Sequence, residues 1–174
     1  MESDDHIPLR VFVADDVSDM RALVRFALED TPDMVVVGEA GNGAAAVEGI
    51  GQTNPDVVLL DLSMPGLDGL EVIPVVQRKS PDTGIVVFSG FEAARMRGTT
   101  AELGADRYVE KGRPLDELRT AIREVGAAKR RGRLPRQGGN SGDDSAGGSA
   151  TGMTAMWDAL IRLRLWLRPA PAPA

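Results

Sequence analysis

The chain has 174 residues, no cysteine, a formal net charge of −6 and 43% hydrophobic residues. This length suits one compact domain with an extension, and the absence of cysteine excludes disulfides, zinc–thiolate sites and thiol nucleophiles. Residues 1–125 hold 12 basic against 23 acidic residues, whereas residues 126–174 hold 8 against 3. An acidic body is poorly suited to neutralising nucleic acid phosphates, so no direct DNA binding is expected.

The first residues, Met1-Glu2-Ser3-Asp4-Asp5, are acidic where a secretory signal would be basic and then apolar. No apolar run is long enough to span a bilayer. Together with the absence of cysteine, this predicts a soluble protein of the cytoplasm. Residues 1–8 are expected to form an N-terminal tail.

Between residues 9 and 125, five short apolar runs alternate with segments of helical periodicity. The runs are rich in β-branched residues and cover residues 9–14, 34–38, 56–60, 84–88 and 107–109. Continuous apolar strands are typical of a parallel sheet that is covered on both faces. Five βα units therefore predict a doubly wound α/β domain with a five-stranded parallel sheet over residues 9–125.

The helical segments carry start and stop signals. Ser18 is the predicted N-cap of the first helix, and Thr31-Pro32 is its predicted stop. Asn42 is the predicted cap of the second helix. Pro114 is expected at the first position of the last helix, where proline is well tolerated.

Two helices have weaker signals. Pro74 interrupts the third helical segment, residues 70–79, where proline kinks a helix or costs about 3 kcal/mol. Gly98-Thr99-Thr100 is expected to break up the fourth helix.

The composition changes after residue 125. Residues 126–152 are first basic and then rich in Gly and Ser, which predicts a flexible linker. Residues 153–168 form a short apolar–basic segment, and residues 169–174 form a Pro/Ala tail. These pieces are too short for a second domain with its own core.

The apolar–basic segment, residues 153–168, permits several interpretations. On a helix it would form a broad apolar face with basic edges, which suits a partner groove or an anionic membrane surface. Residues 161–165 also alternate like a strand. Attraction between this basic segment and the acidic body favours a third interpretation, in which the segment folds back on the domain.

Polar residues stand where the predicted strands end. Asp15 and Asp16 follow the first strand, Asp61 the third, Ser89 the fourth, and Lys111 the fifth. In an open parallel sheet, ligands bind outside the carboxyl ends of the strands. Three carboxylates, a hydroxyl and an ammonium group are therefore expected at one edge of the sheet.

The chemistry of this set indicates phosphoryl transfer. Three neighbouring carboxylates repel one another unless a cation lies between them. Mg²⁺ suits the site best, because it binds one or two carboxylates, keeps several waters and takes a phosphate oxygen as a further ligand. A carboxylate can act as the nucleophile and form an aspartyl phosphate.

Four motifs at the strand ends together resemble those of response-regulator receiver domains. They are Val13-Ala14-Asp15-Asp16, the run from Leu59 to Gly69, Phe88-Ser89-Gly90 and Tyr108-Val109-Glu110-Lys111. The resemblance covers residues 9–125 and implies a flavodoxin-like receiver fold in a single-domain regulator. Residues 36–43 are most similar to receivers of regulators that carry a helix-turn-helix DNA-binding domain.

The resemblance implies a role for each acidic residue. Asp61 is the implied phosphoacceptor. Asp15, Asp16 and Asp61 are implied to hold Mg²⁺, which Mn²⁺ can replace, with a further oxygen from the backbone carbonyl of Ser63.

The resemblance also implies a response to phosphorylation. Lys111 would pair with the phosphoryl group, Ser89 would hydrogen-bond to it, and Tyr108 would turn inward to follow. One departure from the usual pattern is Gly112 directly after the lysine, with proline delayed to Pro114. This departure weakens any expectation of a cis-proline there but leaves the implied role of Lys111 in place.

The family takes its phosphoryl group from a phosphohistidine on a sensor histidine kinase or a histidine phosphotransfer protein. The implied function is therefore a switch that controls an unidentified downstream protein, without enzymatic activity beyond its own phosphorylation and slow dephosphorylation. Dimerisation on phosphorylation is left open.

Three other functions fit the sequence less well. An aspartyl-phosphate-forming phosphatase needs a second aspartate two residues after the first, where Asp61-Leu62-Ser63 has serine. A non-phosphorylated interaction scaffold would normally lose one of the acidic or lysine positions, and all are present here. A flavin site is disfavoured by the acidic loop at residues 15–18.

Other polar residues are expected to be structural or solvated. Asp19, Glu39, Asp56 and Glu71 are interpreted as solvated charges. His6 is the only histidine, and it is not expected to carry a phosphoryl group.

Overall fold

The computed structural model describes residues 7–133. In this part of the chain, five parallel strands form a sheet in the order β2-β1-β3-β4-β5. The strands are short, and their bounds are β1 (Leu9–Ala14), β2 (Met34–Ala40), β3 (Val57–Leu60), β4 (Gly84–Ser89) and β5 (Arg107–Glu110). This order confirms the doubly wound five-stranded sheet, in the arrangement of flavodoxin-like folds.

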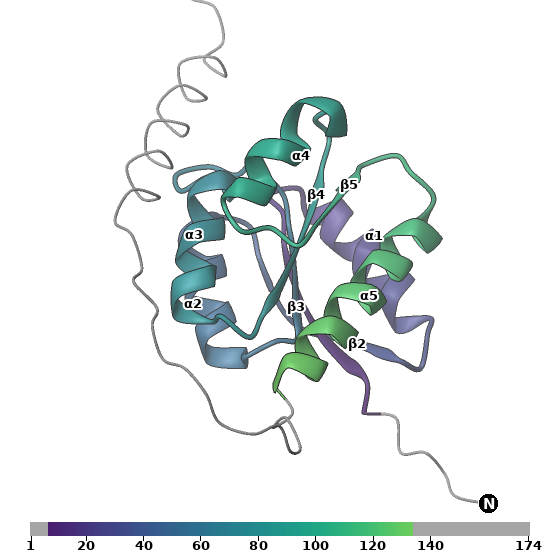
Figure 1. The fold of residues 1–174 in the computed structure, drawn as a ribbon. Coiled ribbons are helices and arrows are strands. Elements are labelled where there is room, and N and C mark those ends of the chain that lie inside the picture. The colour runs from purple at the N-terminus through teal and green to yellow at the C-terminus, as the bar shows by residue number, and fades with distance from the viewer. Residues whose placement is uncertain (1–6, 134–174) are drawn as a thin grey trace, which may run out of the picture. The chain divides into compact units, whose positions relative to one another are not determined.

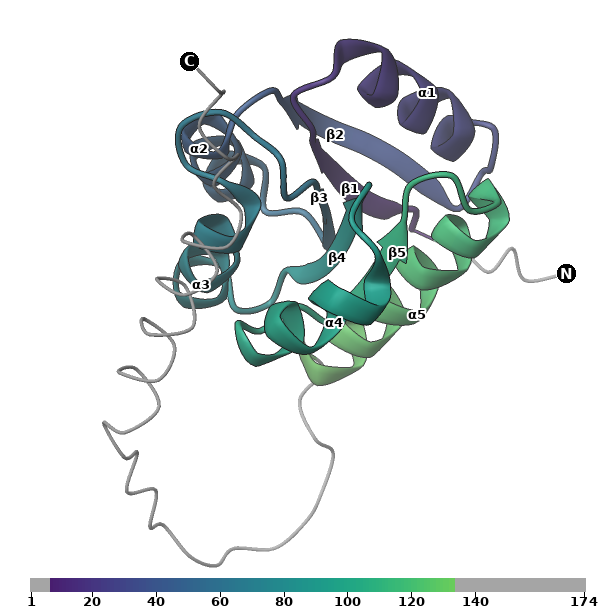
Figure 2. The same cartoon turned by 90° about the horizontal axis from the view of Figure 1, so that it is seen from above.

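Helices cover both faces of the sheet, as Figures 1 and 2 show. Their bounds are α1 (Ser18–Glu29), α2 (Gly43–Thr53), α3 (Gly69–Lys79), α4 (Ala93–Glu102) and α5 (Leu115–Arg133). Helices α1 and α5 lie on one face, and α2, α3 and α4 lie on the other (Figure 2). The strand order reverses at β1, so the carboxyl ends of β1 and β3 border the crevice in which such folds bind ligands.

The core explains why the central strands are apolar at every position. All four residues of β3 are buried, because one face of the strand meets α1 and α5 and the other meets α2 and α3. On the α1/α5 face, Val11, Val57 and Leu59 pack with Leu28 and Ile122. Each fully buried side chain of this kind contributes about 1.5–3 kcal/mol relative to an exposed one.

The helix caps follow the sequence signals only in part. Asn42 caps α2 as predicted, since its side chain accepts a hydrogen bond from Ala45 N at 2.9 Å. The prediction for Ser18 is wrong: Ser18 is the first residue of α1, and the N-cap is Val17, whose side chain cannot cap. The Val17 amide donates a hydrogen bond to the Asp15 carboxylate at 2.9 Å, which closes the turn before the helix.

Helix α3 runs through Pro74. It is held at its start by a capping box, in which Asp68 accepts from the Glu71 amide at 3.0 Å and Glu71 accepts from the Asp68 amide at 3.2 Å. Its apolar face, including Ile73 and Val76, is buried. Capping and burial therefore offset the hydrogen bond that Pro74 cannot donate.

Helix α4 is continuous, so the expected break at residues 98–100 is wrong. The Thr100 side chain is buried and donates to the Met96 carbonyl at 2.9 Å within the helix. Tertiary burial of Met96 and Thr100 thus overrides the low helix propensity of this stretch.

Helix α5 extends to Arg133, eight residues past the predicted end of the domain. Residues 126–133, which were predicted to be the start of the linker, therefore belong to this helix. Ala, Lys and Arg favour helix strongly enough to offset the low helix propensity of Gly126 and Gly132. At its other end, α5 begins at Leu115, and Pro114 lies one residue before it.

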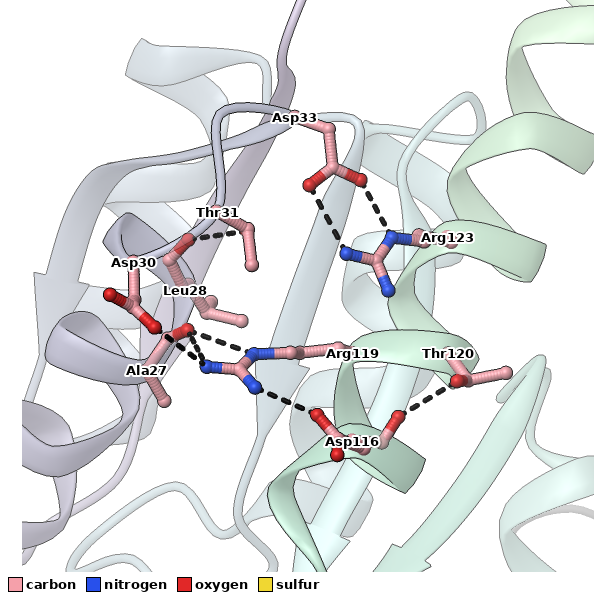
Figure 3. A network of polar contacts seen from close by, with 9 residues as sticks. All are labelled: Ala27, Leu28, Asp30, Thr31, Asp33, Asp116, Arg119, Thr120 and Arg123. Atoms are coloured by element: carbon pink, nitrogen blue, oxygen red, sulfur yellow. Dashed lines mark hydrogen bonds and ion pairs between the residues drawn. The ribbon is translucent and has the colours of Figure 1, made fainter.

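Two arginines of α5 bind the end of α1 and the turn after it (Figure 3). Arg119 donates to the Ala27 carbonyl from Nε at 3.0 Å and from Nη2 at 2.7 Å. Arg123 donates to both oxygens of Asp33, at 2.6 and 3.2 Å. Arg119 therefore links α5 to α1, the other helix on this face of the sheet, and Arg123 links α5 to the turn that follows α1.

Asp56 is not a solvated charge, which corrects the sequence interpretation. Its side chain is buried and accepts from the Arg10 amide at 2.9 Å and from Arg130 at 2.6 Å. Arg130 also donates to the Ile7 and Pro8 carbonyls at 2.7 and 2.8 Å. The carboxylate therefore joins β1, the start of β3 and α5 at the edge of the sheet away from the candidate site.

Two other charges interpreted as solvated are also paired. Glu39 forms ion pairs with Arg21 at 3.5 Å and with Arg25 at 2.6 Å. Glu71 belongs to the capping box of α3.

Within residues 7–133, no helix is long and apolar enough to cross a membrane. The predictions for the N-terminal tail up to residue 6, for His6, for the linker from 134 to 152, and for residues 153–174 fall outside the described residues.

Candidate functional site

Three carboxylates meet at the carboxyl ends of β1 and β3, as the strand-end motifs predict. Asp15 and Asp16 follow β1 and Asp61 follows β3, and one oxygen from each lies within 4.8 Å of the others. Asp15 and Asp61 are each only 3% exposed, whereas Asp16 is exposed. Two of the three acidic groups are thus desolvated beside the third.

The strand register brings these residues together. Ala14 of β1 pairs with Leu60 of β3, and the Asp61 amide donates to the Ala14 carbonyl at 2.8 Å. Asp15 and Asp61 are therefore the first residues beyond the paired strands, where the chains begin to diverge. Their carboxylates stay at the sheet edge because no further strand residues cover them.

Each buried carboxylate has one oxygen held by the backbone. Asp15 Oδ1 accepts from the Val17 amide at 2.9 Å, and Asp61 Oδ1 accepts from the Leu62 amide at 2.8 Å. The second oxygen of each faces the same ammonium group: Lys111 Nζ lies 2.7 Å from Asp15 Oδ2 and 3.2 Å from Asp61 Oδ2. The side chains are therefore oriented before any ligand binds.

Lys111 is positioned by the end of β5. Its amide donates to the Ser89 carbonyl at 2.8 Å, so the lysine stands beside the end of β4. Gly112 follows with a φ of 95°, a left-handed conformation that glycine adopts without strain. This turn accounts for glycine where the pattern of the resemblance has proline, and the described residues contain no cis peptide bond.

The electrostatics of the site are those of a crowded acidic cluster. Burial raises the pKa of Asp61; the Lys111 ammonium offsets part of this rise, and the Asp15 carboxylate adds to it. Burial alone would lower the pKa of Lys111, but its contacts with Asp15 and Asp61 raise it on balance. Lys111 is therefore held as a cation.

One ammonium group faces three carboxylates, so the cluster retains an excess of negative charge when all four groups are ionised. The donor set consists only of oxygen atoms, and the closeness of the carboxylates favours a small divalent cation among them. The residues present therefore fit a hard metal ion such as Mg²⁺.

The backbone of Asp61 is in close contact with the start of α3. The Gly69 amide donates to the Leu62 carbonyl at 3.1 Å. A Cβ atom on Gly69 would lie 2.1 Å from the Asp61 carbonyl oxygen and 2.7 Å from Leu62 Cα. Only glycine fits at this position without displacing the backbone that carries Asp61.

Ser89 and Tyr108 lie next to the acidic cluster in the strands that flank it. Ser89 is completely buried, and its hydroxyl has no hydrogen-bond partner among residues 7–133. Tyr108 points inward, is 5% exposed and donates from its hydroxyl to the Phe91 carbonyl at 2.8 Å. Burial raises the pKa of Tyr108, and the neighbouring Ser89 hydroxyl offsets part of this rise.

Ser63 is the remaining predicted site residue. It lies two residues after Asp61 in the loop between β3 and α3, and it is exposed. Its role through the backbone carbonyl stays a prediction.

Sequence reasoning missed two residues near the site. Asp68 lies within the motif from Leu59 to Gly69 and has no role in the sequence analysis, although Asp68 and Glu71 have the spacing of a capping box. Glu110 belongs to the lysine motif but has no predicted role, yet its carboxylate accepts a hydrogen bond from the Ala93 amide at the start of α4. No local sequence signal indicates that second contact, because the two residues are 17 positions apart.

Comparison with known proteins agrees with this geometry. The model of the response regulator receiver domain matches residues 11–123. The nitrate/nitrite response regulator protein NarL of Escherichia coli (strain K12) is 35% identical over 122 residues, which cover 70% of this chain and 56% of that protein. A protein-glutamate methylesterase/protein-glutamine glutaminase of Nocardioides is 35% identical over 145 residues, covering 75% of this chain and 39% of that protein.

Solved structures show the same relationship. The signal receiver domain of a NarL response regulator from Mycobacterium tuberculosis superposes with a TM-score of 0.66 at 34% identity, covering 70% of this chain and 98% of that one. The chain spans about half the length of the curated NarL protein, at 56%. The matched residues include both strand-end acidic motifs and the first part of α5. This chain therefore belongs to the family of response regulator receiver domains.

Proposed function

We propose that this chain is a phosphorylatable receiver of a two-component phosphorelay. Asp61 accepts the phosphoryl group from a phosphohistidine, and the domain changes conformation to control the binding of a partner. The observation that carries the proposal is the placement of Asp61: its buried carboxylate lies 3.2 Å from Lys111 Nζ and beside the Asp15 and Asp16 carboxylates. A nucleophile, a cation-binding cluster and a fixed positive charge are the parts that phosphoryl transfer to a carboxylate requires.

The transfer forms one bond and breaks another. An oxygen of Asp61 bonds to phosphorus while the phosphorus–nitrogen bond of the phosphohistidine breaks. The electron pair of that bond returns to the imidazole nitrogen. With the other ring nitrogen of the phosphohistidine protonated, the leaving group is neutral imidazole, and no further proton is required. Lys111 stands where it can neutralise charge on the oxygens of the transferred group.

Asp15, Asp16, Asp61 and the backbone carbonyl of Ser63 would hold Mg²⁺, or Mn²⁺ in its place. When bound, the ion supplies charge neutralisation for the phosphate oxygens. The chain's own groups supply the orientation: the Val17 and Leu62 amides fix one oxygen of Asp15 and of Asp61 respectively.

Ser89 and Tyr108 carry the response. The buried Ser89 hydroxyl is a donor without a protein acceptor among the described residues, and phosphorylation of Asp61 would provide one. Movement of Ser89 and its neighbours would then alter the packing around Tyr108, which is anchored to the Phe91 carbonyl. A phosphoryl group shifts the conformational equilibrium only through such differential contacts.

The partners follow from this chemistry. The phosphoryl donor is a sensor histidine kinase or a histidine phosphotransfer protein, and the receiver acts on a downstream protein in the cytoplasm. Receiver domains are mostly non-enzymatic, and the methylesterase relative matches this chain over only 39% of its own length. The chain itself therefore performs only its own phosphorylation and slow dephosphorylation.

The test is direct phosphorylation. Wild-type protein incubated with acetyl phosphate and Mg²⁺ should gain the mass of one phosphoryl group that hydroxylamine removes, as hydroxylamine cleaves acyl phosphates. Asp61→Asn should abolish the gain, and omission of divalent cation should prevent it. Intact-protein mass spectrometry measures both.

Asp19→Asn is the matched control, because Asp19 is an exposed acidic residue in the first turn of α1 near the same sheet edge. It should be phosphorylated like the wild type. Equal labelling of wild type and Asp61→Asn would contradict the assignment of the phosphoacceptor. No labelling of the wild type by acetyl phosphate or by any phosphohistidine donor would favour the scaffold alternative.

A further inference from the structure

In helix α4, few side chains are buried and none caps the first turn. Only Met96 and Thr100 are buried in this helix, and its N-cap residue, Glu92, makes no side-chain capping hydrogen bond. Gly98 and Thr99 add little intrinsic helix preference. The position of the first turn must therefore depend on contacts from other elements.

One such contact comes from the last residue of β5. The Glu110 carboxylate accepts a hydrogen bond from the amide of Ala93, the first residue of α4. The first amides of a helix have no partner within the helix, and a negative charge at this end is favoured by the helix dipole. Glu110 thus supplies the cap that Glu92 does not.

A second contact comes from the same face of β5. Tyr108 and Glu110 are two residues apart in the strand, so their side chains point to the same side of the sheet. The Tyr108 hydroxyl binds the Phe91 carbonyl at 2.8 Å, two residues before Ala93. Together the two side chains hold the connection between β4 and α4.

The next residue of the chain belongs to the acidic cluster. Lys111 Nζ contacts Asp15 and Asp61, and the Lys111 amide is bonded to the Ser89 carbonyl. Two adjacent residues therefore contact different parts of the molecule: Lys111 contacts the site at which phosphorylation is proposed, and Glu110 contacts the first turn of α4.

We propose that Glu110 is a positioning residue that couples Lys111 to α4, so that the first turn of α4 follows the state of Asp61. The response to phosphorylation rests on the proposed function, whereas the capping of α4 by Glu110 does not. A phosphoryl group on Asp61 gives the lysine a new anionic partner. Any shift of Lys111 moves the adjoining backbone of β5, and the Glu110 carboxylate carries that shift to Ala93.

The cap is tested first, without any phosphoryl group, by amide hydrogen exchange measured by NMR. In Glu110→Ala the Ala93 amide should exchange about five- to tenfold faster than in the wild type, the effect expected for loss of a helix cap. Glu110→Gln keeps an acceptor oxygen without the charge and should restore part of the protection. Unchanged exchange of Ala93 in Glu110→Ala would overturn the proposal.

Glu92→Ala is the matched control at the same helix end. Its side chain is 71% exposed, pairs with Arg95 and gives no capping bond, so its removal should leave Ala93 exchange close to that of the wild type. Equal acceleration in Glu92→Ala and Glu110→Ala would show that Ala93 responds to the loss of either negative charge and not specifically to the Glu110 hydrogen bond, which would also overturn the proposal.

The coupling is tested with Mg²⁺ and beryllofluoride, a mimic of the phosphoryl group. In the wild type the mimic should shift the amide resonances of Leu62 and Ala93, and in Glu110→Ala the shift at Leu62 should remain while the shift at Ala93 is lost. An Ala93 shift of equal size in both proteins would overturn the coupling.

Absence of any shift at Leu62 in the wild type would instead count against the proposed function. In that case Lys111→Ala decides the coupling without a phosphoryl mimic. Release of the lysine from Asp15 and Asp61 should change Ala93 exchange in the wild-type background but not in Glu110→Ala. No change in either background would overturn the coupling.

Discussion

Ser89 has a buried hydroxyl whose hydrogen-bonding capacity is unused in the described part of the chain. Leaving a buried polar group without a partner costs about 1–3 kcal/mol. A residue kept at such a cost is typical of a functional position, where stability is sacrificed for a contact made in another state. This agrees with the proposal that Ser89 binds the phosphoryl group.

Ser89→Ala should therefore leave the free energy of unfolding unchanged or raise it by up to about 1 kcal/mol, because the lost hydroxyl makes no bond. The same variant should weaken the conformational response to Mg²⁺ and beryllofluoride. Urea denaturation monitored by circular dichroism measures the first effect.

Thr83→Val provides the contrast for this prediction. Thr83 is also buried, but its hydroxyl donates to the Pro55 carbonyl at 3.0 Å. Its replacement should cost about 1 kcal/mol, because the carbonyl loses its partner. A Ser89→Ala protein as destabilised as Thr83→Val would show that the Ser89 hydroxyl is satisfied in solution.

Individual residues were predictable where their partners are close in sequence or follow from topology. Asp15, Asp61 and Lys111 were predicted to meet because the carboxyl ends of neighbouring parallel strands share one edge. Asp56 was misjudged because its partner Arg130 lies 74 residues away on α5. No local pattern distinguishes such a buried carboxylate from a solvated one.

At the scale of elements, the corner between α5 and the turn before β2 is held by charge. Arg123 binds Asp33 through two hydrogen bonds, and this contact is the main reason why the pKa of Asp33 is lowered (Figure 3). The Arg123 side chain is 44% exposed, so solvent screens the pair and its contribution is at most about 1 kcal/mol.

The sign of the pH effect follows from the lowered pKa. A carboxyl group with a lower pKa in the folded state stabilises the fold above its unfolded pKa, and this contribution is lost as the pH falls through the folded value. The difference in unfolding free energy between wild type and Asp33→Asn should therefore be largest near pH 6 and should shrink below about pH 4. Denaturant titrations across this range measure it.

The control for this prediction is the Arg123→Gln background. Without the guanidinium group, Asp33→Asn should produce a much smaller pH-dependent difference, because only Thr31 and the backbone still lower the pKa of Asp33. Persistence of the difference in that background would assign it to another partner of Asp33.

The elements themselves were predicted well where burial decides them. All five strands lie where the apolar runs indicated, with bounds that differ by no more than two residues. The helix ends were less predictable, because caps depend on single hydrogen bonds. Asn42 caps α2 with its own side chain, whereas α1 has no side-chain cap, and Asp15 accepts only from the amide of the N-cap residue Val17.

At the scale of the whole molecule, charge is unevenly distributed along the sequence: residues 1–125 are acidic and residues 126–174 are basic. The segment at residues 153–168 lies outside the described residues, and its contact with a partner groove or an anionic membrane remains a prediction of the sequence. Trp157 and Trp166 are the only tryptophans, so their fluorescence reports on this segment alone.

Vesicles containing phosphatidylserine should shift that emission to the blue if the segment binds an anionic surface, and added salt should reverse the shift. Vesicles of phosphatidylcholine alone are the control. Deletion of residues 153–174 should abolish binding and leave phosphorylation of Asp61 intact. Emission that neither vesicles nor a cognate partner protein alters would contradict a recruiting role.

The close contact between Gly69 and the Asp61 carbonyl constrains how this sequence can change over evolutionary time. Seven residues separate the two positions, and the loop they form must return α3 to within contact of the backbone that carries the proposed phosphoacceptor. An insertion or deletion in the loop would move the glycine out of register, and a larger residue at 69 would displace the backbone of Asp61. Natural variants that retain phosphorylation should therefore conserve both the loop length and the glycine. Variants without the glycine should also vary in loop length.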